Sequence, residues 1–376
     1  MLTTVHQPYD TRIFHKEAKS LAKVHNVVLI APDKEKADKE VDGVRIITVK
    51  KPGSKVLHPM TMWRVFKAGF KQDCDVYHCH EPGSLFVCAI LKVLRGKKLV
   101  YDAHEHYPSL IAEDSLFPDF IRPLVRFFAD VEERALVRFA DVVITVDENL
   151  ASKYKKQHKD VVIISNYPKL SLFSETKISD DLKNEFERNM VLLYVGGLTK
   201  DRGTLESIQA LQKIVKKVPN AKLVFLGEFK GGAEYKEEVI SYVEKNNFGR
   251  YVEFSGYVPH EDVVEYMNMA KVGTLFHQPI PRYINAVSIK LFEYMACGLP
   301  VVASNFPAIS RVVKEADCGI LVDPTDVDEI ADAMVYLLKH PEEAKMMGEN
   351  GRRAVEEKYN WERMEERLLA LYEGLK

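Results

Sequence analysis

The 376-residue sequence predicts an α/β protein of two doubly wound domains, and three observations support this fold class. Short runs of Val, Ile and Leu alternate with segments of helical periodicity, a pattern typical of parallel sheets that helices cover on both faces. The alternation stops in a polar stretch at 166–189 and then begins again. The chain is also longer than one hydrophobic core usually supports. We therefore expect domains at 1–165 and 190–358, joined by a linker at 166–189.

In the first domain, the pattern predicts helices at 13–23, 83–94 and 119–140, where apolar residues recur at helical spacing. The strands are apolar, mostly β-branched runs between these helices. They are expected at 1–5, 27–32, 44–49, 75–79, 98–101, 142–146 and 161–165. Because strands separated by helices usually pair in parallel, we expect a parallel sheet here.

The second domain repeats this alternation. Its strands are expected at 192–196, 221–227, 251–256, 272–277, 300–304 and 319–324. A helix at 289–297 follows Ser288, a residue type that caps helix N-termini, and it ends before Gly298. In the final segment, 359–376, apolar residues form one helical stripe that needs a partner surface. Its members are Trp361, Met364, Leu368, Leu371 and Leu375.

The composition excludes several classes of protein. A net charge of −2 argues against a nucleic-acid binder. The five cysteines include no C-x-x-C pair, which argues against a disulfide framework or a structural zinc site and fits a reducing cytoplasm. The N-terminus lacks a signal-peptide pattern, and no apolar stretch approaches the roughly 20 residues that span a bilayer. We therefore expect a cytoplasmic protein.

Three common motifs are absent. The first strand is not followed by G-x-G-x-x-G, which argues against a dinucleotide-dependent oxidoreductase, and no P-loop sequence is present. The H-E-x-x-H pattern is missing as well. We interpret His104-Glu105-His106, after a predicted strand, as part of a functional loop rather than a metal site. The sequence thus predicts neither a metal nor a bound cofactor.

A glycine-rich turn follows the first strand of the second domain. Gly196 and Gly197 end this strand, and Arg202 lies before the expected helix. Glycines let a ligand approach the backbone closely, the start of a helix favours phosphate, and Arg can bind phosphate oxygens in a bidentate manner. A glycine turn is often only a turn, so this motif is weak when it stands alone.

The start of the helix at 289–297 supplies a second motif. Free backbone N–H groups near Ser288 and the helix dipole favour an anion there. Lys290 lies in the first turn and Glu293 one turn later, so both side chains can face the same crevice. An anion bound at the helix start, with a hydroxyl-bearing group bound at Glu293, fits a nucleotide diphosphate. Since ligands bind at the carboxyl ends of parallel strands, both motifs are expected to face one cleft.

Histidines also follow strands in the first half of the chain. We interpret His104 as a candidate functional residue at the rim of this cleft. The commoner explanation for His78, His80 and His106 is that they are loop residues without a role.

Taken together, these motifs resemble glycosyltransferase family 4, which has the GT-B fold. The resemblance rests on Y-V-G-G-L-x-x-x-R-G, S-I-K-L-F-E-Y-M-A-C-G-L-P-V-V-A-S and Y-N-W-E-R, and on the opening H-Q-P-Y-D-T-R-I-F-H-K-E-A-K-S-L-A. It implies two Rossmann-like domains facing across a cleft, with the helix of 359–376 crossing back to the first. It also implies a retaining, metal-independent enzyme of the hexosyltransferase type. Such an enzyme moves a sugar from a UDP-, GDP- or ADP-linked donor to a glycan, lipid-linked or small-molecule acceptor.

The resemblance assigns roles to individual residues. Glu293 matches the glutamate that binds the ribose hydroxyls, and Arg202 stands where a diphosphate-binding lysine is usual. His104 matches the histidine that hydrogen-bonds the donor sugar near the reaction centre. The remaining assignments are Ser288, Ile289 and Lys290 at the phosphates, and the backbone of Tyr257 and Val258 at the base.

Two positions depart from the family pattern. Gly197 replaces the arginine of the frequent G-R-L, and Asn285 replaces the first glutamate of E-x7-E, which normally contacts the transferred sugar. An Asn still donates and accepts hydrogen bonds, so the replacement is compatible with activity but is expected to change which sugar is transferred. Two other functions stay open. One is a nucleotide-sugar 2-epimerase or hydrolase, and the other is a non-catalytic nucleotide-sugar-binding subunit.

The basic segment 50–72 contains six Lys and Arg residues, no acid, and several large apolar residues. A solvated basic face is the commoner explanation of such a segment. The alternative is peripheral attachment to anionic lipid at the inner face of the cell membrane, which would bring a lipid-linked acceptor to the first domain.

Overall fold

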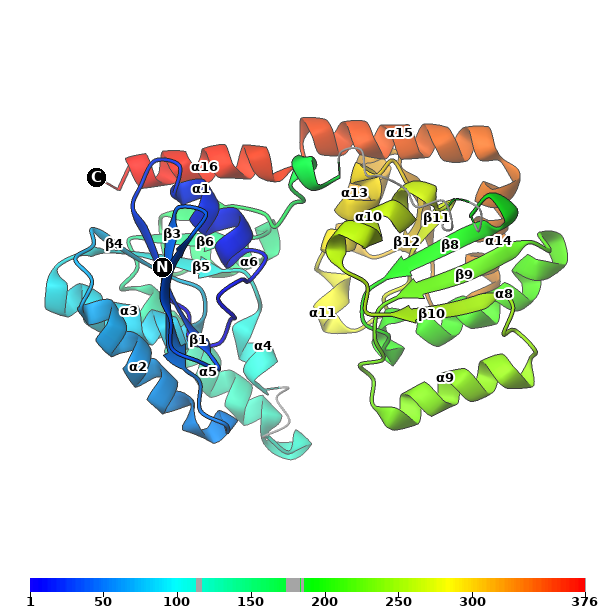
Figure 1. The fold of residues 1–376 in the computed structure, drawn as a ribbon. Coiled ribbons are helices and arrows are strands. Elements are labelled where there is room, and N and C mark those ends of the chain that lie inside the picture. Colours follow the sequence, from blue (N-terminus) through cyan, green and yellow to red (C-terminus); the bar gives the residue numbers. More distant parts are fainter. Residues whose placement is uncertain (113–116, 174–182, 184–185, 376) are drawn as a thin grey trace. The chain divides into compact units, whose positions relative to one another are not determined.

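A computed structural model covers the chain and describes residues 1–112, 117–173, 183 and 186–375. The chain forms two compact units, shown as ribbons in Figure 1. The first unit contains Met1–Asn166 and the returning segment Trp361–Lys376, and the second contains Tyr167–Asn360. Both are α/β units with parallel sheets, which confirms the predicted fold class.

The first unit contains two sheets. In one, β4 (Val76–Cys79), β5 (Lys98–Ala103), β6 (Val142–Thr145) and β7 (Val161–Ile163) pair in parallel in that order. In the other, β1 (Val27–Asp33) pairs in parallel with β3 (Val44–Lys50), and β3 pairs with β2 (Asp38–Val41). The strand expected at 1–5 is wrong in extent, because only Leu2 forms bridges, to Ile30 and Cys79. This single residue nevertheless connects the two sheets.

Strand β2 was not predicted, because its residues are polar and mostly exposed. It is antiparallel to β3 and turns back through Asp42 and Gly43, whose φ values are +51° and +76°. An Asp-Gly pair favours such a tight hairpin turn and was the signal that could have found it.

The helices of the first unit include those expected at 13–23, 83–94 and 119–140. The first begins as a π-helix, η1 (Ile13–Ala18), and continues as α1 (Lys19–Leu21). The basic segment 50–72 contains an additional helix, α2 (His58–Phe70). The remaining helices are α3 (Pro82–Arg95), α4 (Tyr107–Ala112), α5 (Arg122–Val137) and α6 (Glu148–Lys155).

The C-terminal helix α16 (Trp361–Glu373) completes the core of the first unit. Trp361, Met364 and Leu368 of the predicted stripe are buried. The indole Nε1 of Trp361 donates to Ser20 Oγ at 3.0 Å, and this hydroxyl donates to Glu365 Oε2 at 2.6 Å. A buried indole N–H needs such an acceptor, so the contact fixes α16 against α1.

The second unit has one sheet of six parallel strands, all at predicted positions, in the order β10-β9-β8-β11-β12-β13. Their bounds are β8 (Met190–Val195), β9 (Ala221–Leu226), β10 (Val252–Gly256), β11 (Val272–Leu275), β12 (Val301–Ser304) and β13 (Gly319–Val322). The direction of strand addition reverses between β8 and β11. In open α/β sheets such a switch point leaves a crevice at the carboxyl ends of the strands.

Helices pack on both faces of this sheet over two hydrophobic clusters. They are α8 (Thr204–Lys217), α9 (Ala233–Lys245), α10 (His260–Met269), α11 (Pro281–Ile284), α12 (Ile289–Ala296), α13 (Pro307–Ala316), α14 (Val327–Lys339) and α15 (Pro341–Glu357).

The linker expected at 166–189 lies partly outside the described residues. Its described parts largely belong to the second unit. Tyr167 packs edge-on against Phe292, with ring centroids 4.8 Å apart, and Phe173 and Phe186 are buried in the same cluster.

Candidate active site

A buried ionic network lies at the carboxyl ends of β4 and β5 in the first unit. Arg12 donates to both oxygens of Asp102 at 2.8 Å, in the bidentate geometry that planar guanidinium groups favour. The same carboxylate lies 3.3 Å from His80 Nδ1 and 3.1 Å from His104 Nδ1. Burial alone would raise the pKa of Asp102, but the charge of Arg12 holds this pKa well below its usual range.

His104 is held by contacts on both sides of its ring. Nδ1 faces Asp102, and Nε2 lies 3.1 Å from the hydroxyl of Tyr107, the first residue of α4. The side chain is only 10% exposed. Its orientation is therefore fixed, although its expected contact with a donor sugar stays a prediction.

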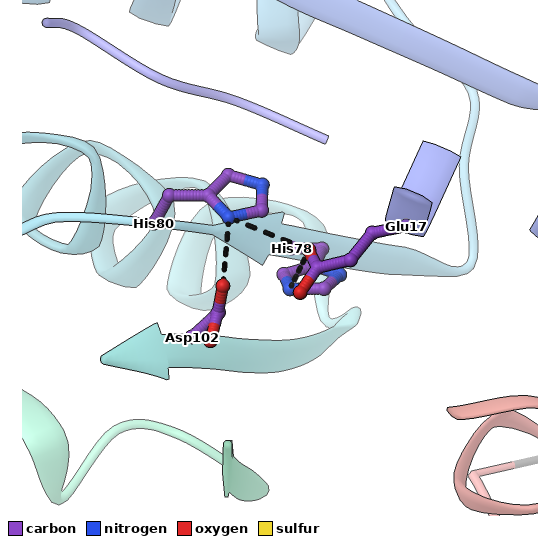
Figure 2. A group of neighbouring side chains, drawn as sticks. All are labelled: Glu17, His78, His80 and Asp102. Carbon is purple, nitrogen blue, oxygen red and sulfur yellow. Dashed lines mark hydrogen bonds and ion pairs between the residues drawn. The ribbon is translucent and has the colours of Figure 1, made fainter. Parts of the chain in front are cut away.

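Glu17, on η1, lies between two histidines (Figure 2). Its Oε2 atom is 3.7 Å from His78 Nε2 and 3.6 Å from His80 Nδ1, and its Oε1 atom is 3.0 Å from Arg12 Nη2. Burial and the charge of Asp102 raise the pKa of Glu17 well above its usual range. Burial also lowers the pKa of His80 to about 4. The raised pKa favours the protonated form of Glu17, and the lowered pKa favours the neutral form of His80.

The histidines interpreted as loop residues differ in position. His78 lies within β4, inside the strand predicted at 75–79, and His80 follows this strand directly; both are buried, so neither is an exposed loop residue. His78 Nδ1 lies 2.8 Å from the hydroxyl of Tyr372 on α16. His106 alone of the three is exposed, and it contacts Ser109 at the start of α4.

Glu17, His78, His80 and Asp102 each offer one atom that could bind a metal, and these atoms lie within 4.8 Å of one another. However, both Asp102 oxygens accept from Arg12, whose guanidinium also lies against Glu17. Arg12 thus already supplies the positive charge that these carboxylates require, and it would repel a divalent ion. The residues fit an ionic network better than a metal centre.

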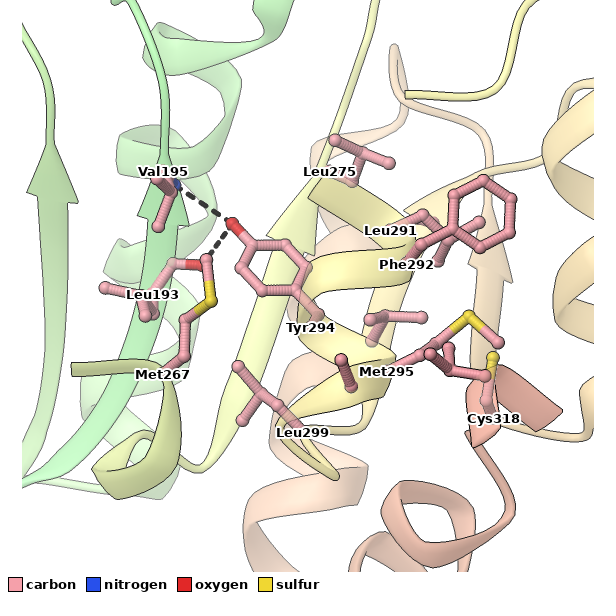
Figure 3. Packing of buried hydrophobic residues seen from close by; sticks show 14 of the residues in the cluster. Leu193, Val195, Met267, Leu275, Leu291, Phe292, Tyr294, Met295, Leu299 and Cys318 are labelled. Carbon is pink, nitrogen blue, oxygen red and sulfur yellow. Dashed lines mark hydrogen bonds between the residues drawn. The ribbon is translucent and has the colours of Figure 1, made fainter. Parts of the chain in front are cut away.

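In the second unit, Tyr294 connects α12 to the end of β8. β11 pairs with β8 only at Leu192 and Leu193, so the two strands separate beyond that point. The Tyr294 hydroxyl accepts from Val195 N at 2.9 Å and lies 3.4 Å from the carbonyl oxygen of Leu193 (Figure 3). It thereby supplies the hydrogen-bond acceptor that β11 does not provide for Val195. Burial raises its pKa well above the usual range, which keeps it a donor.

Gly273 of β11 makes room for this tyrosine. A Cβ atom at position 273 would lie 2.7 Å from the Tyr294 ring, closer than packed atoms come. The glycine in the strand therefore allows the ring to pass from α12 to β8. As a result, Glu293 and Gly196, which adjoin Tyr294 and Val195, are held in one part of the unit.

Two loops meet at the glycine turn after β8. Gly196 has a φ of +140°, and a Cβ atom at Gly227, which follows β9, would lie 1.9 Å from the Gly196 carbonyl oxygen. Leu198 N donates to Glu228 O at 2.8 Å, and Lys230 N donates to Leu198 O at 3.0 Å. The loop after β9 therefore fixes the backbone of the glycine turn after β8.

Arg202 folds back over this turn. It ends a short 3-10 helix, η5 (Lys200–Arg202), which precedes α8 and was not predicted. Its Nη1 donates to Gly197 O at 3.3 Å, and its Nε donates to Tyr283 Oη at 3.2 Å. The structure thus brings together Gly196, Gly197 and Arg202.

Helix α12 begins at Ile289, as predicted, with Ser288 as its cap. Ser288 Oγ accepts from Lys290 N at 3.4 Å, so this N–H is already satisfied. Lys290 Nζ donates to Glu293 Oε2 at 2.9 Å, and Glu293 is only 6% exposed. The two side chains do face the same place, but here they pair with each other.

The other predicted site residues lie around these elements. Asn285 is exposed and follows α11. Tyr257 is 77% exposed after the edge strand β10, and Val258 is half-buried against the core.

Two further residues beside the site were not predicted. His277, the second residue after β11, stacks on Tyr283 with centroids 4.1 Å apart, and its buried Nδ1 has no hydrogen-bond partner among the described residues. Burial and the charge of Arg202 lower its pKa to about 4. Lys230 covers Gly197, since a Cβ atom there would lie 2.9 Å from Lys230 Cδ. A polar residue at the end of the apolar strand predicted at 272–277 was the signal that could have identified His277.

Comparison with known families and proteins gives matches over both units. The model described as Glycosyltransferase Family 4 matches residues 11–167, and the model described as Glycosyl transferases group 1 matches residues 176–354. The chain is 25% identical over 311 residues to N-acetyl-alpha-D-glucosaminyl L-malate synthase of Bacillus anthracis, covering 80% of this chain and 75% of the relative.

Solved structures of similar fold cover nearly the whole chain. Sucrose-phosphate synthase from Thermosynechococcus elongatus superposes with a TM-score of 0.76 at 22% identity, covering 96% of this chain and 92% of that one. Anabaena HepE in complex with UDP gives a TM-score of 0.73 at 15% identity, covering 99% and 98%. These likenesses confirm the GT-B fold.

The Tyr294→Phe substitution is expected to lower the free energy of unfolding of the second unit by about 1–3 kcal/mol, because Val195 N–H loses its acceptor. Circular dichroism during urea unfolding measures this change, and hydrogen exchange at residues 190–196 reports it locally. Tyr336→Phe, at an exposed tyrosine of the same unit, is the control. Equal stability and exchange in the two variants would contradict the assigned contact.

The first unit should lose stability through His80 as the pH falls from 6.5 towards 4. In this range the unfolded chain binds a proton at His80 that the folded chain excludes, so stability decreases with acidification. Over this range, the free energy of unfolding of the wild type should fall by about 1.4 kcal/mol per pH unit more than that of His80→Asn, a variant that retains an N–H donor.

Tryptophan fluorescence during urea unfolding measures this difference, because both tryptophans, Trp63 and Trp361, lie in the first unit. Glu17 acts in the opposite direction, since its raised pKa weakens the fold as the pH rises, but both proteins contain it. Parallel pH profiles for the two proteins would show that the assignment to His80 is wrong.

Proposed function

Because the chain belongs to glycosyltransferase family 4, we propose that it transfers a sugar from a nucleotide diphosphate to the hydroxyl of an acceptor. The proposed reaction retains the anomeric configuration and needs no metal ion. The observation that carries the proposal is the Tyr294 contact with β8. It holds the glycine turn with Arg202 and the buried carboxyl group of Glu293 beside the same switch point.

The proposed donor lies with its diphosphate at the glycine turn. The backbone N–H of Gly197 and the guanidinium of Arg202 would bind phosphate oxygens, while Glu293 would accept from the ribose hydroxyls. Glu293 is now paired with Lys290 at 2.9 Å. A carboxylate can accept several hydrogen bonds, so ribose hydroxyls can bind Glu293 while its ion pair with Lys290 stays intact. In this arrangement Lys290 orients Glu293.

In the proposed reaction, the bond between the anomeric carbon and the phosphate oxygen breaks. The acceptor hydroxyl oxygen bonds to the same carbon from the same face, and its proton passes to the departing phosphate. Arg202 stabilises the negative charge that grows on the diphosphate, the role of a positioned cation in a site shielded from water. His104, whose ring is fixed by Asp102 and Tyr107, would position the sugar.

Lys230 supports this proposal at the position where the chain lacks the family's arginine. The Cγ and Cδ atoms of its aliphatic stem occupy the space above Gly197, so the side chain starts from the turn. Lysine binds phosphate as a point charge rather than as a bidentate group. We therefore propose that Lys230 replaces the missing arginine.

The nucleotide base is the least constrained part of the proposal. Tyr257 and Val258, whose backbone is expected at the base, follow the edge strand β10. UDP is the first candidate, since the similarly folded HepE was solved with UDP. GDP and ADP are the alternatives.

Arg202→Ala and Glu293→Ala are each expected to lower turnover by about 100-fold or more, because each removes a group that binds the leaving nucleotide. Titration calorimetry with UDP, GDP and ADP identifies the base, and release of the nucleotide from the matching sugar donor, with an acceptor panel, measures turnover. A chelator should leave the rate unchanged.

Arg250→Ala and Glu237→Ala change exposed residues of the same types and serve as controls. Turnover near that of wild type in either test variant would overturn the proposal. Donor consumed without acceptor would instead indicate an epimerase or hydrolase, and binding without turnover would indicate a non-catalytic subunit.

Lys230→Ala is expected to weaken nucleotide diphosphate binding about tenfold, since one charged contact is lost. Gly197→Arg combined with Lys230→Ala should restore it, because the shortened side chain leaves space for the arginine. Calorimetry measures both, with Lys245→Ala as the exposed control. Unchanged binding in Lys230→Ala would remove this lysine from the site.

A further inference from the structure

We infer that one face of the first unit attaches to an anionic lipid surface, a property separate from the proposed transfer reaction. This face, the α2–α3 face, consists of the outward side chains of two adjacent helices. They are Met60, Trp63, Arg64, Lys67, Phe70 and Lys71 at α2, and Phe86, Ile90, Val93, Leu94 and Arg95 on α3.

The α2–α3 face exposes several large apolar side chains to solvent. Trp63 is 56% exposed, Val93 67% and Leu94 59%, and four other large apolar residues of the face are more than one-third exposed. Neighbouring apolar side chains of this size on a protein surface usually mark an interaction site. The Trp63 ring stacks on Phe66 at 5.4 Å, which presents a flat aromatic surface along α2.

The charges of this face have one sign. Neither α2 nor α3 contains an acidic residue, and four basic side chains lie among the apolar ones. Lys67 Nζ lies 4.9 Å from the centroid of the Trp63 ring, and the Arg95 guanidinium lies 5.2 Å from that of Phe70. The second contact joins the two helices, so the face is continuous across them.

These features match the boundary of an anionic bilayer. Tryptophan and phenylalanine insert at the level of the headgroups, and Lys and Arg bind anionic headgroups while their stems contact apolar surface. A second copy of the chain is disfavoured, because two identical faces would bring only positive charges together. Among the described residues, no helix is long and apolar enough to span a bilayer.

The neighbouring helix α5, which contacts α3, extends the apolar surface. Leu124, Phe127, Phe128 and Val131 are each about half-exposed or more. Unlike α2 and α3, this helix contains both acidic and basic residues, so α5 is expected to lie at the margin of the contact.

The test measures sedimentation of the full chain with phospholipid vesicles, without any nucleotide. Vesicles of phosphatidylcholine mixed with phosphatidylglycerol should bind the protein more strongly than vesicles of phosphatidylcholine alone, and high salt should weaken the difference. Lys67→Gln combined with Lys71→Gln should lower the partition coefficient about 30-fold, the effect of two basic residues near the surface. Val93→Ser combined with Leu94→Ser should lower it on both vesicle types.

Matched controls use exposed residues outside the face. Lys216→Gln with Lys314→Gln and Val24→Ser with Met346→Ser should bind as wild type does. Absence of binding to the mixed vesicles, or equal binding by the test and control variants, would overturn the inference. A dimer detected by light scattering and lost only in the test variants, without vesicle binding, would overturn it in favour of a protein interface.

Discussion

The hydrogen bonds of Tyr294 are the contact on which the candidate site depends. At a switch point two neighbouring strands lose each other as partners, and their backbone N–H groups are left in the core. Here a side chain from α12 satisfies one of them, at Val195. The residue before this tyrosine, Glu293, and the residue after this valine, Gly196, are both predicted site residues. A contact that completes the sheet therefore also holds the two predicted binding motifs near each other.

The first unit fixes its candidate residue by a different means. His104 owes its orientation to a buried carboxylate, and that carboxylate is charged because Arg12 is buried beside it. A buried ion pair adds little stability compared with apolar packing, but it selects one arrangement of its neighbours. Glu17 lies beside two histidines of this network, and its raised pKa favours the form that carries a proton. The network reaches α16 through His78 and Tyr372, so the last helix takes part in it.

Most of the fold could be predicted from sequence because strands of a doubly wound sheet are apolar on both faces. All six strands of the second unit follow this pattern. The cap of α12 at Ser288 was predicted from its residue type. Two of the missed elements depart from this pattern: β2 is polar and exposed, and α2 has an apolar side that faces outward. The cluster around Glu17 could not be predicted, because it joins residues that are distant in the chain. The roles of His104, Arg202 and Glu293 came from resemblance and stay predictions.

The return of the chain at Trp361 has a consequence for biosynthesis. The first unit contains the earliest and the latest parts of the chain, whereas the second is a continuous segment. On the ribosome, the second unit can therefore finish folding while the first still lacks Trp361, Met364 and Leu368 from its core. Until α16 emerges, the apolar surface beneath it is open to water and to chaperones. Residues 1–166 are thus made before the second unit but are completed as a folded unit after it.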